Sequence, residues 1–165
     1  MTIEAAIFDL DGTLVSLPID YTALYAELQK ITGIENIEPV TETLATINDT
    51  LKGNVFEIWT KAEFAVLPRM KIVKEGVELY NQYSEVSKVL VTMQGKKTAK
   101  RILKTLGLRF QAIISREDSL DRSVQIALAL KKLKLKPENA IVIGDRETDK
   151  TAAEKLGCKF KMVNQ

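Results

Sequence analysis

Five short apolar segments, spaced so that helices fit between several of them, constrain the fold of this chain more than any other feature. They are residues 3–8, 88–92, 111–115, 140–144 and 159–163, each of a length suited to a buried strand. Three are followed by helical patterns, at 95–106, 121–134 and 147–156, which end at a glycine or before a proline. This alternation predicts an α/β fold: a Rossmann-like, mostly parallel five-stranded sheet flanked by helices.

Residues 16–68 interrupt the alternation, because they contain no convincing strand. Their apolar residues recur instead at helical spacing. The predicted helices contain Tyr21, Leu24, Leu28 and Ile31 before Gly33; Leu44, Ile47 and Leu51 before Gly53; and, after a cap at Asn54, Ile58, Trp59 and Ala62. A helix at 72–83 is expected to return to the sheet. We therefore expect an α/β core of residues 1–15 and 69–165 with a helical cap inserted at 16–68; alternatively, these helices merely cover the sheet.

Composition limits the possible chemistry. The chain of 165 residues has no histidine and a single cysteine, Cys158, which excludes histidine-based nucleophile pairs and an intramolecular disulfide. Carboxylates must therefore carry any acid–base work. With 24 basic and 22 acidic residues, we expect neither nucleic acid nor a membrane as a partner. The absence of an apolar run of about 18 residues favours a cytoplasmic protein. A monomer and a homodimer are both open, because a helical cap can be free or can pack against a partner.

Acidic residues follow two of the predicted strands. The first strand ends in Asp9-Leu10-Asp11-Gly12-Thr13, and the fourth ends in Gly144-Asp145, with Asp149 four positions further on. Gly12 permits a tight exit that exposes both carboxylates of the first segment. Ligands of open parallel sheets bind beyond the carboxyl ends of strands, and Mg²⁺ prefers oxygen ligands. The two segments therefore predict a magnesium site.

A phosphate site is predicted beside these acids. Thr92 ends the second strand and is followed by Met93, Gln94 and a helix. A hydroxyl together with free N–H groups at a helix N-terminus is suited to holding phosphate oxygens. A cation is also needed; the candidates, in order of preference, are Arg122, Arg116 and Lys96.

These residues together resemble the haloacid dehalogenase superfamily. Its phosphatases carry an Asp-x-Asp-Gly-Thr motif, a Ser or Thr ending strand two, a Lys or Arg before strand four, and a Gly-Asp-x-x-x-Asp motif. The candidates here are 9–13, Thr92, Arg122 and 144–149. Many relatives have Lys-Pro at the third motif, where this chain has Ser119-Leu120-Asp121-Arg122-Ser123. The insertion looks like that family's small cap domain.

The resemblance implies a role for each matching residue. Asp9 would attack phosphorus to form an aspartyl-phosphate, and Asp11 would act as general acid and base. Thr92, Arg122 and Mg²⁺ would hold the phosphoryl oxygens. The implied phosphate-binding residues are Gly12, Thr13, Met93 and Gln94, and the implied metal ligands are Asp9, Asp11 through its backbone carbonyl, Asp145 and Asp149.

The expected activity is hydrolysis of a small phosphomonoester, because the resemblance is to phosphoglycolate phosphatase-like members. Two alternatives remain open from the sequence. One is a sugar phosphomutase of the same family, which would return the phosphoryl group to its substrate. The other is a receiver-like or non-catalytic phosphate-binding module.

Overall fold

A single parallel sheet forms the centre of the protein, whose computed structural model describes residues 2–164. The five apolar segments form its strands: β1 (Ala5–Phe8), β4 (Ser87–Val91), β5 (Ala112–Ile114), β6 (Ala140–Gly144) and β7 (Lys159–Met162). Their order is β5-β4-β1-β6-β7, and each neighbouring pair is parallel. The predicted α/β fold is confirmed. The strand order reverses at β1, so the carboxyl ends of β1, β4 and β6 meet where such sheets bind ligands.

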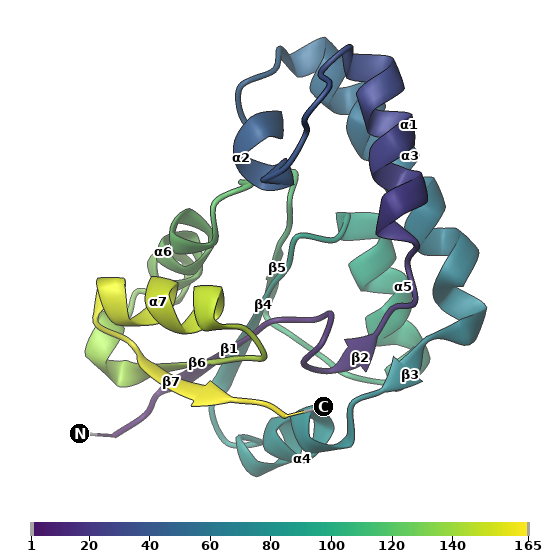
Figure 1. Ribbon diagram of the computed structural model, residues 1–165. Helices are drawn as coiled ribbons and strands as arrows, with labels where there is room; N and C mark the ends of the chain where they lie inside the picture. Colours follow the sequence, from purple (N-terminus) through teal and green to yellow (C-terminus); the bar gives the residue numbers. More distant parts are fainter. Residues whose placement is uncertain (1, 165) are drawn as a thin grey trace.

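Helices cover both faces of the sheet (Figure 1). Alternate residues of a strand point to opposite faces. Phe8 and Leu90 accordingly pack with α4 (Lys74–Gln82) and α5 (Lys96–Leu106). Ile7, Val89 and Val142 pack on the other face with α6 (Arg122–Leu133) and α7 (Glu147–Leu156). Short 3₁₀ helices at Leu67–Arg69 and Pro137–Asn139 complete the connections.

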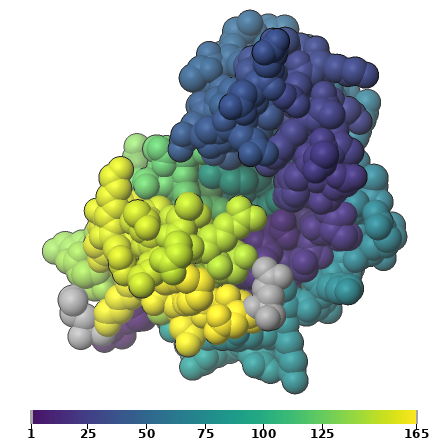
Figure 2. Space-filling model, viewed as in Figure 1, coloured from purple at the N-terminus to yellow at the C-terminus, as the bar shows by residue number. Residues whose placement is uncertain are grey.

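The inserted residues form three helices at one end of the molecule, coloured purple to blue in Figures 1 and 2. They are α1 (Tyr21–Thr32), α2 (Val40–Leu44) and α3 (Asp49–Val66). Their buried residues Leu24, Leu28, Leu44, Val55 and Trp59 form a cluster of their own. A separate apolar cluster supports the idea of a distinct cap, whose bounds at 16 and 68 stay a prediction.

Helix α3 corrects the expected break at Gly53. The side chain of Asn48 caps the helix by accepting a hydrogen bond from the Leu51 N–H at 2.9 Å, so neither Gly53 nor Asn54 marks a boundary. A glycine inside a helix costs only about 1 kcal/mol relative to alanine. Helix α3 buries the apolar side chains of Val55, Trp59 and Val66, together with Glu63. Burying one apolar side chain contributes about 1.5–3 kcal/mol, which outweighs the cost of the glycine.

Two very short strands lie at the base of the insertion, where the sequence predicts none. β2 (Val15–Ser16) and β3 (Lys71–Ile72) pair antiparallel where the chain enters and leaves the helical end. Two residues are too few to show a strand period, and Ile72 ends β3 instead of starting the helix expected at 72–83.

Within the described residues, no helix has the length and apolar character needed to span a membrane.

Candidate active site

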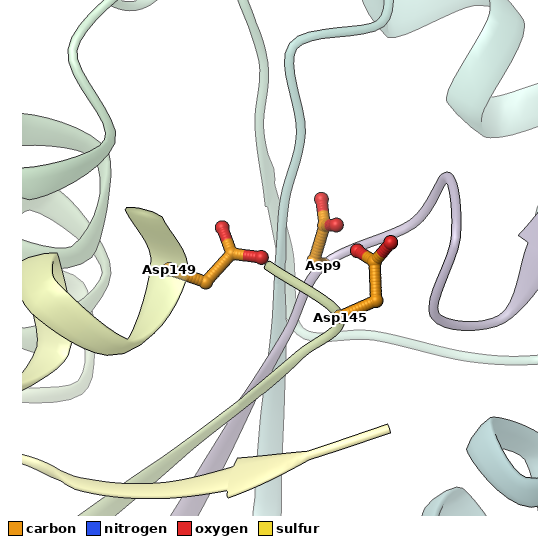
Figure 3. A group of neighbouring side chains, drawn as sticks. All are labelled: Asp9, Asp145 and Asp149. Atoms are coloured by element: carbon orange, nitrogen blue, oxygen red, sulfur yellow. The ribbon is translucent and has the colours of Figure 1, made fainter. Parts of the chain in front are cut away.

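Three acidic side chains meet beyond the carboxyl ends of β1 and β6. Asp9 directly follows β1, Asp145 directly follows β6, and Asp149 lies in the first turn of α7. One carboxylate oxygen from each lies within 4.8 Å of the others, and Figure 3 shows the three side chains turned toward one shared space. Because β1 and β6 are hydrogen-bonded neighbours, the sheet itself holds Asp9 and Asp145 together.

The turn after Asp9 lies against the carboxylates of Asp9 and Asp145. Gly12 has a φ of 86°, and a Cβ there would collide with the carboxylate of Asp145, so glycine is needed for both conformation and space. The Thr13 hydroxyl lies 3.4 Å from both the Asp9 and the Asp145 carboxylate. Neither Gly12 nor Thr13 lines the adjoining cavity. Their expected contact with phosphate stays a prediction, and the structure gives them a supporting position.

Arg122 forms ion pairs with two of the acids. It opens α6, where Asp121 caps the helix through the N–H groups of Ser123 and Val124. Its Nη2 lies 3.0 Å from Asp9 Oδ1, and its Nε lies 3.1 Å from Asp149 Oδ1. A bridge from one guanidinium to two of the three carboxylates fixes their relative positions.

Gln125 holds Arg122 in place, a role that no sequence pattern indicates. Arg122 Nη1 donates to Gln125 Oε1 at 2.8 Å. The buried Gln125 amide in turn donates to the carbonyl oxygens of Thr92 and Ser119, each at 2.9 Å. This side chain therefore ties the cation to the end of β4.

The other two candidate cations lie elsewhere. Arg116 is fully buried, and its Nη1 lies 2.6 Å from Glu63 Oε2 of α3. Lys96 pairs with Asp118 at 3.3 Å. Neither Arg116 nor Lys96 lines the cavity, so the structure does not support either as the phosphate-binding cation.

The N-terminus of α5 corrects part of the predicted phosphate site. Two N–H groups at its start are occupied: Gly95 donates to Glu63 Oε1 at 3.2 Å, and Lys96 donates to Glu117 at 3.2 Å. The buried Thr92 hydroxyl donates to Gln94 Oε1 at 2.7 Å and accepts from the Gln94 N–H. Met93 and Gln94 do line the cavity, whereas Thr92 does not. A helix N-terminus near a site is therefore not available to a ligand when carboxylates from other elements reach it first.

Burial and mutual repulsion raise the pKa values of Asp9, Asp11 and Asp149. Burial raises the pKa of Asp9 to about 8; Arg122 opposes this shift, while Asp149 and Asp145 add to it. Burial likewise raises the pKa of Asp149 and of Asp11, although a hydrogen bond of 2.9 Å from the Leu17 N–H to Asp11 Oδ1 opposes the second shift. Arg122 bridges two of these carboxylates, and three carboxylates converge on one shared space. An all-carboxylate set of this kind suits a hard divalent cation.

A cavity of about 730 Å³ opens between the acids and the inserted helices. Asp9, Asp11, Arg122 and Asp149 line its floor. Its other walls come from α1, α2, α3, the first turn of α7 and the loops at the strand ends: Tyr21, Tyr25, Val40, Thr41, Glu42, Ala45, Trp59, Met93, Gln94, Ser119, Leu120, Asp121, Arg146 and Thr148. The sequence does not single out Tyr25, Glu42 or Arg146, because an exposed polar residue carries no positional signal until the cap is placed over the sheet.

Comparison with known proteins identifies the family. The model of haloacid dehalogenase-like hydrolases matches residues 6–163. The chain therefore belongs to the haloacid dehalogenase-like hydrolases, and phosphatases are among its relatives. It is 24% identical over 176 residues to the phosphoglycolate phosphatase of Aquifex aeolicus, covering 95% of this chain and 83% of that protein.

Other matches agree on the fold. A haloacid dehalogenase-like hydrolase from Streptococcus pneumoniae superimposes with a TM-score of 0.68 at 23% identity, covering 96% of this chain and 83% of that one. CbbY from Rhodobacter sphaeroides, solved with phosphate, gives 0.67 at 17% identity and covers 96% and 85%. The chain is also 29% identical over 132 residues to an aspartyl/glutamyl-tRNA(Asn/Gln) amidotransferase polypeptide of Methanocaldococcus jannaschii, over 76% of this chain but only 27% of that protein.

Proposed function

We propose that this chain is a magnesium-dependent phosphomonoester hydrolase whose nucleophile is Asp9. The observation that carries the proposal is the placement of Asp9 within 4.8 Å of Asp145 and Asp149 and 3.0 Å from Arg122. A carboxylate nucleophile needs a cation that neutralises the phosphate it attacks, and this site combines a fixed guanidinium with an acidic group able to hold a metal. The similarity to a phosphoglycolate phosphatase over 95% of the chain supports the same activity.

In the first step, an oxygen of Asp9 forms a bond to phosphorus as the bond to the alcohol oxygen breaks. That oxygen leaves with the electron pair and takes a proton from Asp11, which lines the cavity beside Asp9. Burial raises the pKa of Asp11, which favours the protonated acid that this step requires. The product is an aspartyl-phosphate on Asp9.

In the second step, water attacks phosphorus, and the bond from phosphorus to Asp9 breaks. Asp11 accepts the proton of the water and returns to its starting state. Arg122 remains beside the phosphoryl oxygens, while Gln125 keeps its guanidinium in position. Positioned charge of this kind supplies much of the rate in phosphoryl transfer.

Asp9, Asp145 and Asp149 are the residues that would hold the metal ion. Their fit rests on three converging carboxylates with one arginine among them and on the raised pKa values of Asp9 and Asp149. A bound Mg²⁺ supplies positive charge that lowers the pKa of Asp9 and neutralises the phosphoryl oxygens. The helices of 16–68 would act as a cap that excludes water and admits a small leaving group.

Hydrolysis of an aryl phosphate tests the proposal. Asp9→Asn is expected to lower kcat by about a thousandfold or more, since one member of a catalytic unit is lost. Asp20→Asn is the matched control, because Asp20 is an exposed helix cap and asparagine caps equally well. The native protein should also lose its activity in a chelator and regain it with Mg²⁺. Equal activity of the native protein and Asp9→Asn would contradict the mechanism.

A further inference from the structure

The upper walls of the cavity take no part in the proposed hydrolysis. Asp9, Asp11, Arg122 and Asp149 form the floor, whereas Tyr21 and Tyr25 project from α1 into the same space. A phosphate held on the floor would direct its leaving group toward these upper walls. The groups there therefore determine which alcohol fits.

Two arginines line the cavity, and they are in different situations. All three nitrogens of the Arg122 guanidinium already bind Asp9, Asp149 or Gln125. Arg146 is exposed to the cavity. A guanidinium keeps its positive charge at any pH a protein meets. Arg146 is therefore a charged group at the wall that the phosphate chemistry does not use.

Tyr21 and Tyr25 face the same region as Arg146. Their rings pack at a centroid distance of 5.6 Å, and each tyrosine feels the charge of Arg146 electrostatically. Burial raises the pKa of both phenols, as does Asp11 at Tyr21 and Glu38 at Tyr25. Both hydroxyls thus stay protonated at neutral pH and can donate hydrogen bonds.

The acids on the cavity walls do not cancel this arrangement. Asp121 already accepts hydrogen bonds from two backbone N–H groups as the cap of α6. Glu42 is exposed on the short helix α2, where water screens its charge. The remaining acids belong to the floor, where the metal would balance them. The cavity consequently presents one guanidinium, at the N-terminus of α7, and two phenol donors from α1.

We propose that Arg146, Tyr21 and Tyr25 form a subsite for an anionic group on the leaving alcohol, so that the substrates are phosphomonoesters of small hydroxy acids or of phosphorylated alcohols. The inference rests on the proposed function and extends it to substrate class. A guanidinium with two neutral donors matches the oxygens of a carboxylate or of a second phosphate.

Matched two-carbon esters test the subsite. They are phosphoglycolate, 2-hydroxyethyl phosphate, phosphoethanolamine and the bisphosphate of ethylene glycol, which carry a carboxylate, a hydroxyl, an ammonium and a second phosphate. We expect the native protein to favour an anionic ester over 2-hydroxyethyl phosphate by about 10- to 100-fold in kcat/KM, as charge-assisted hydrogen bonds are lost in the neutral ester. Phosphoethanolamine should be the poorest. The better of the two anionic esters identifies the anion.

Arg146→Met should reduce the preference for the anionic ester to about threefold or less, mainly through KM, with Arg146→Lys retaining part of it. Tyr21→Phe should reduce it by a smaller factor. Arg109→Met is the matched control: Arg109 is exposed and precedes β5, at the opposite edge of the sheet from the site. Its preference should equal that of the native protein.

Two results would overturn the subsite alone. In the first, the native protein hydrolyses the aryl phosphate, and its kcat/KM for 2-hydroxyethyl phosphate equals that for the anionic esters. In the second, the Arg146→Met variant keeps the native preference for the anionic ester. A native protein that hydrolyses none of these esters with Mg²⁺ would overturn the proposed function and the subsite together. The aryl phosphate therefore separates the two failures.

Discussion

Two arginines six positions apart in the sequence lie in opposite electrostatic settings. Arg116 is fully buried and pairs with the single carboxylate of Glu63. It also contacts Thr60 Oγ1, the backbone carbonyls of Met93 and Phe56, and the rings of Trp59 and Phe56. Arg122 lies among three acids at the wall of a cavity.

The comparison separates a structural charge pair from a proposed active site. Glu63 also accepts hydrogen bonds from the Gly95 N–H and the Thr98 hydroxyl, so each of its oxygens is occupied and nothing is left for a ligand. At Arg122 the acids outnumber the cation, and the pKa of Asp9 rises to about 8. A buried arginine beside a carboxylate is thus not a functional signal by itself; surplus charge next to a cavity is.

The largest stability effect is expected at the structural pair. Glu63→Gln keeps the shape but leaves Arg116 without a counter-charge, which should lower the free energy of unfolding by about 3–5 kcal/mol. Glu57→Gln, an exposed site on the same helix α3, should change it by about 0.5 kcal/mol or less. Urea unfolding measures both. Equal losses of unfolding free energy in the two variants would contradict the structural role of the buried Glu63–Arg116 pair.

At the reactive site, stability should depend on pH and on Mg²⁺ together. Since folding raises the pKa of Asp9 from 3.8 to about 8, the folded state binds more protons than the unfolded state between these values, and the metal-free protein loses stability as the pH rises through that window. Ion binding needs the ionised carboxylates. Mg²⁺ at about a hundred times its Kd at pH 8 should stabilise by about 2.7 kcal/mol, and the same concentration should do far less at pH 5.

Thermal unfolding with and without the ion at both pH values measures this. The Asp9→Asn variant should lose most of the pH dependence of the metal-free protein. Stabilisation by Mg²⁺ of equal size at pH 5 and pH 8 would count against an acidic metal site.

A smaller effect of opposite sign to Glu63→Gln is expected for Asp149→Asn. Burial disfavours the Asp149 carboxylate, whose pKa is raised, so neutralising it should stabilise the metal-free protein by about 1 kcal/mol, or about 2–4 °C in Tm. The same change should weaken Mg²⁺ binding. Calorimetry would show both, with Asp20→Asn unchanged in each. Destabilisation of the metal-free protein would indicate that Asp149 is a structural partner of Arg122, like Glu63 for Arg116.

The fold was predictable because its signals are local. Apolar segments of strand length and glycine-terminated helices indicate the sheet, and because carboxyl ends of parallel strands share an edge, Asp9 and Asp145 could be placed together from sequence. The helix end predicted at Gly53 is wrong, because helix propensity is a weak guide once a helix buries one side. The strands β2 and β3 are too short to show a period.

The surroundings of the site were less predictable, because they depend on how the inserted helices meet the sheet. Glu63 and Arg116 are 53 residues apart, and nothing in either local sequence indicates the pair. Glu63 also accepts the Gly95 N–H at the start of α5, and Glu117 accepts the Lys96 N–H. Gln125 and Arg146 likewise gain meaning only from the packing around them.

Trapping of the covalent intermediate tests the central claim most directly. Asp11→Asn should slow the breakdown of an aspartyl-phosphate, because water then lacks its general base. After acid quenching of this variant with an aryl phosphate and Mg²⁺, mass spectrometry should find the phosphoryl group on the peptide that contains Asp9, and on no peptide of the Asp9→Asn protein. Turnover of the ester by the Asp11→Asn protein without a phosphoryl group on Asp9, or with one on another residue, would contradict the account.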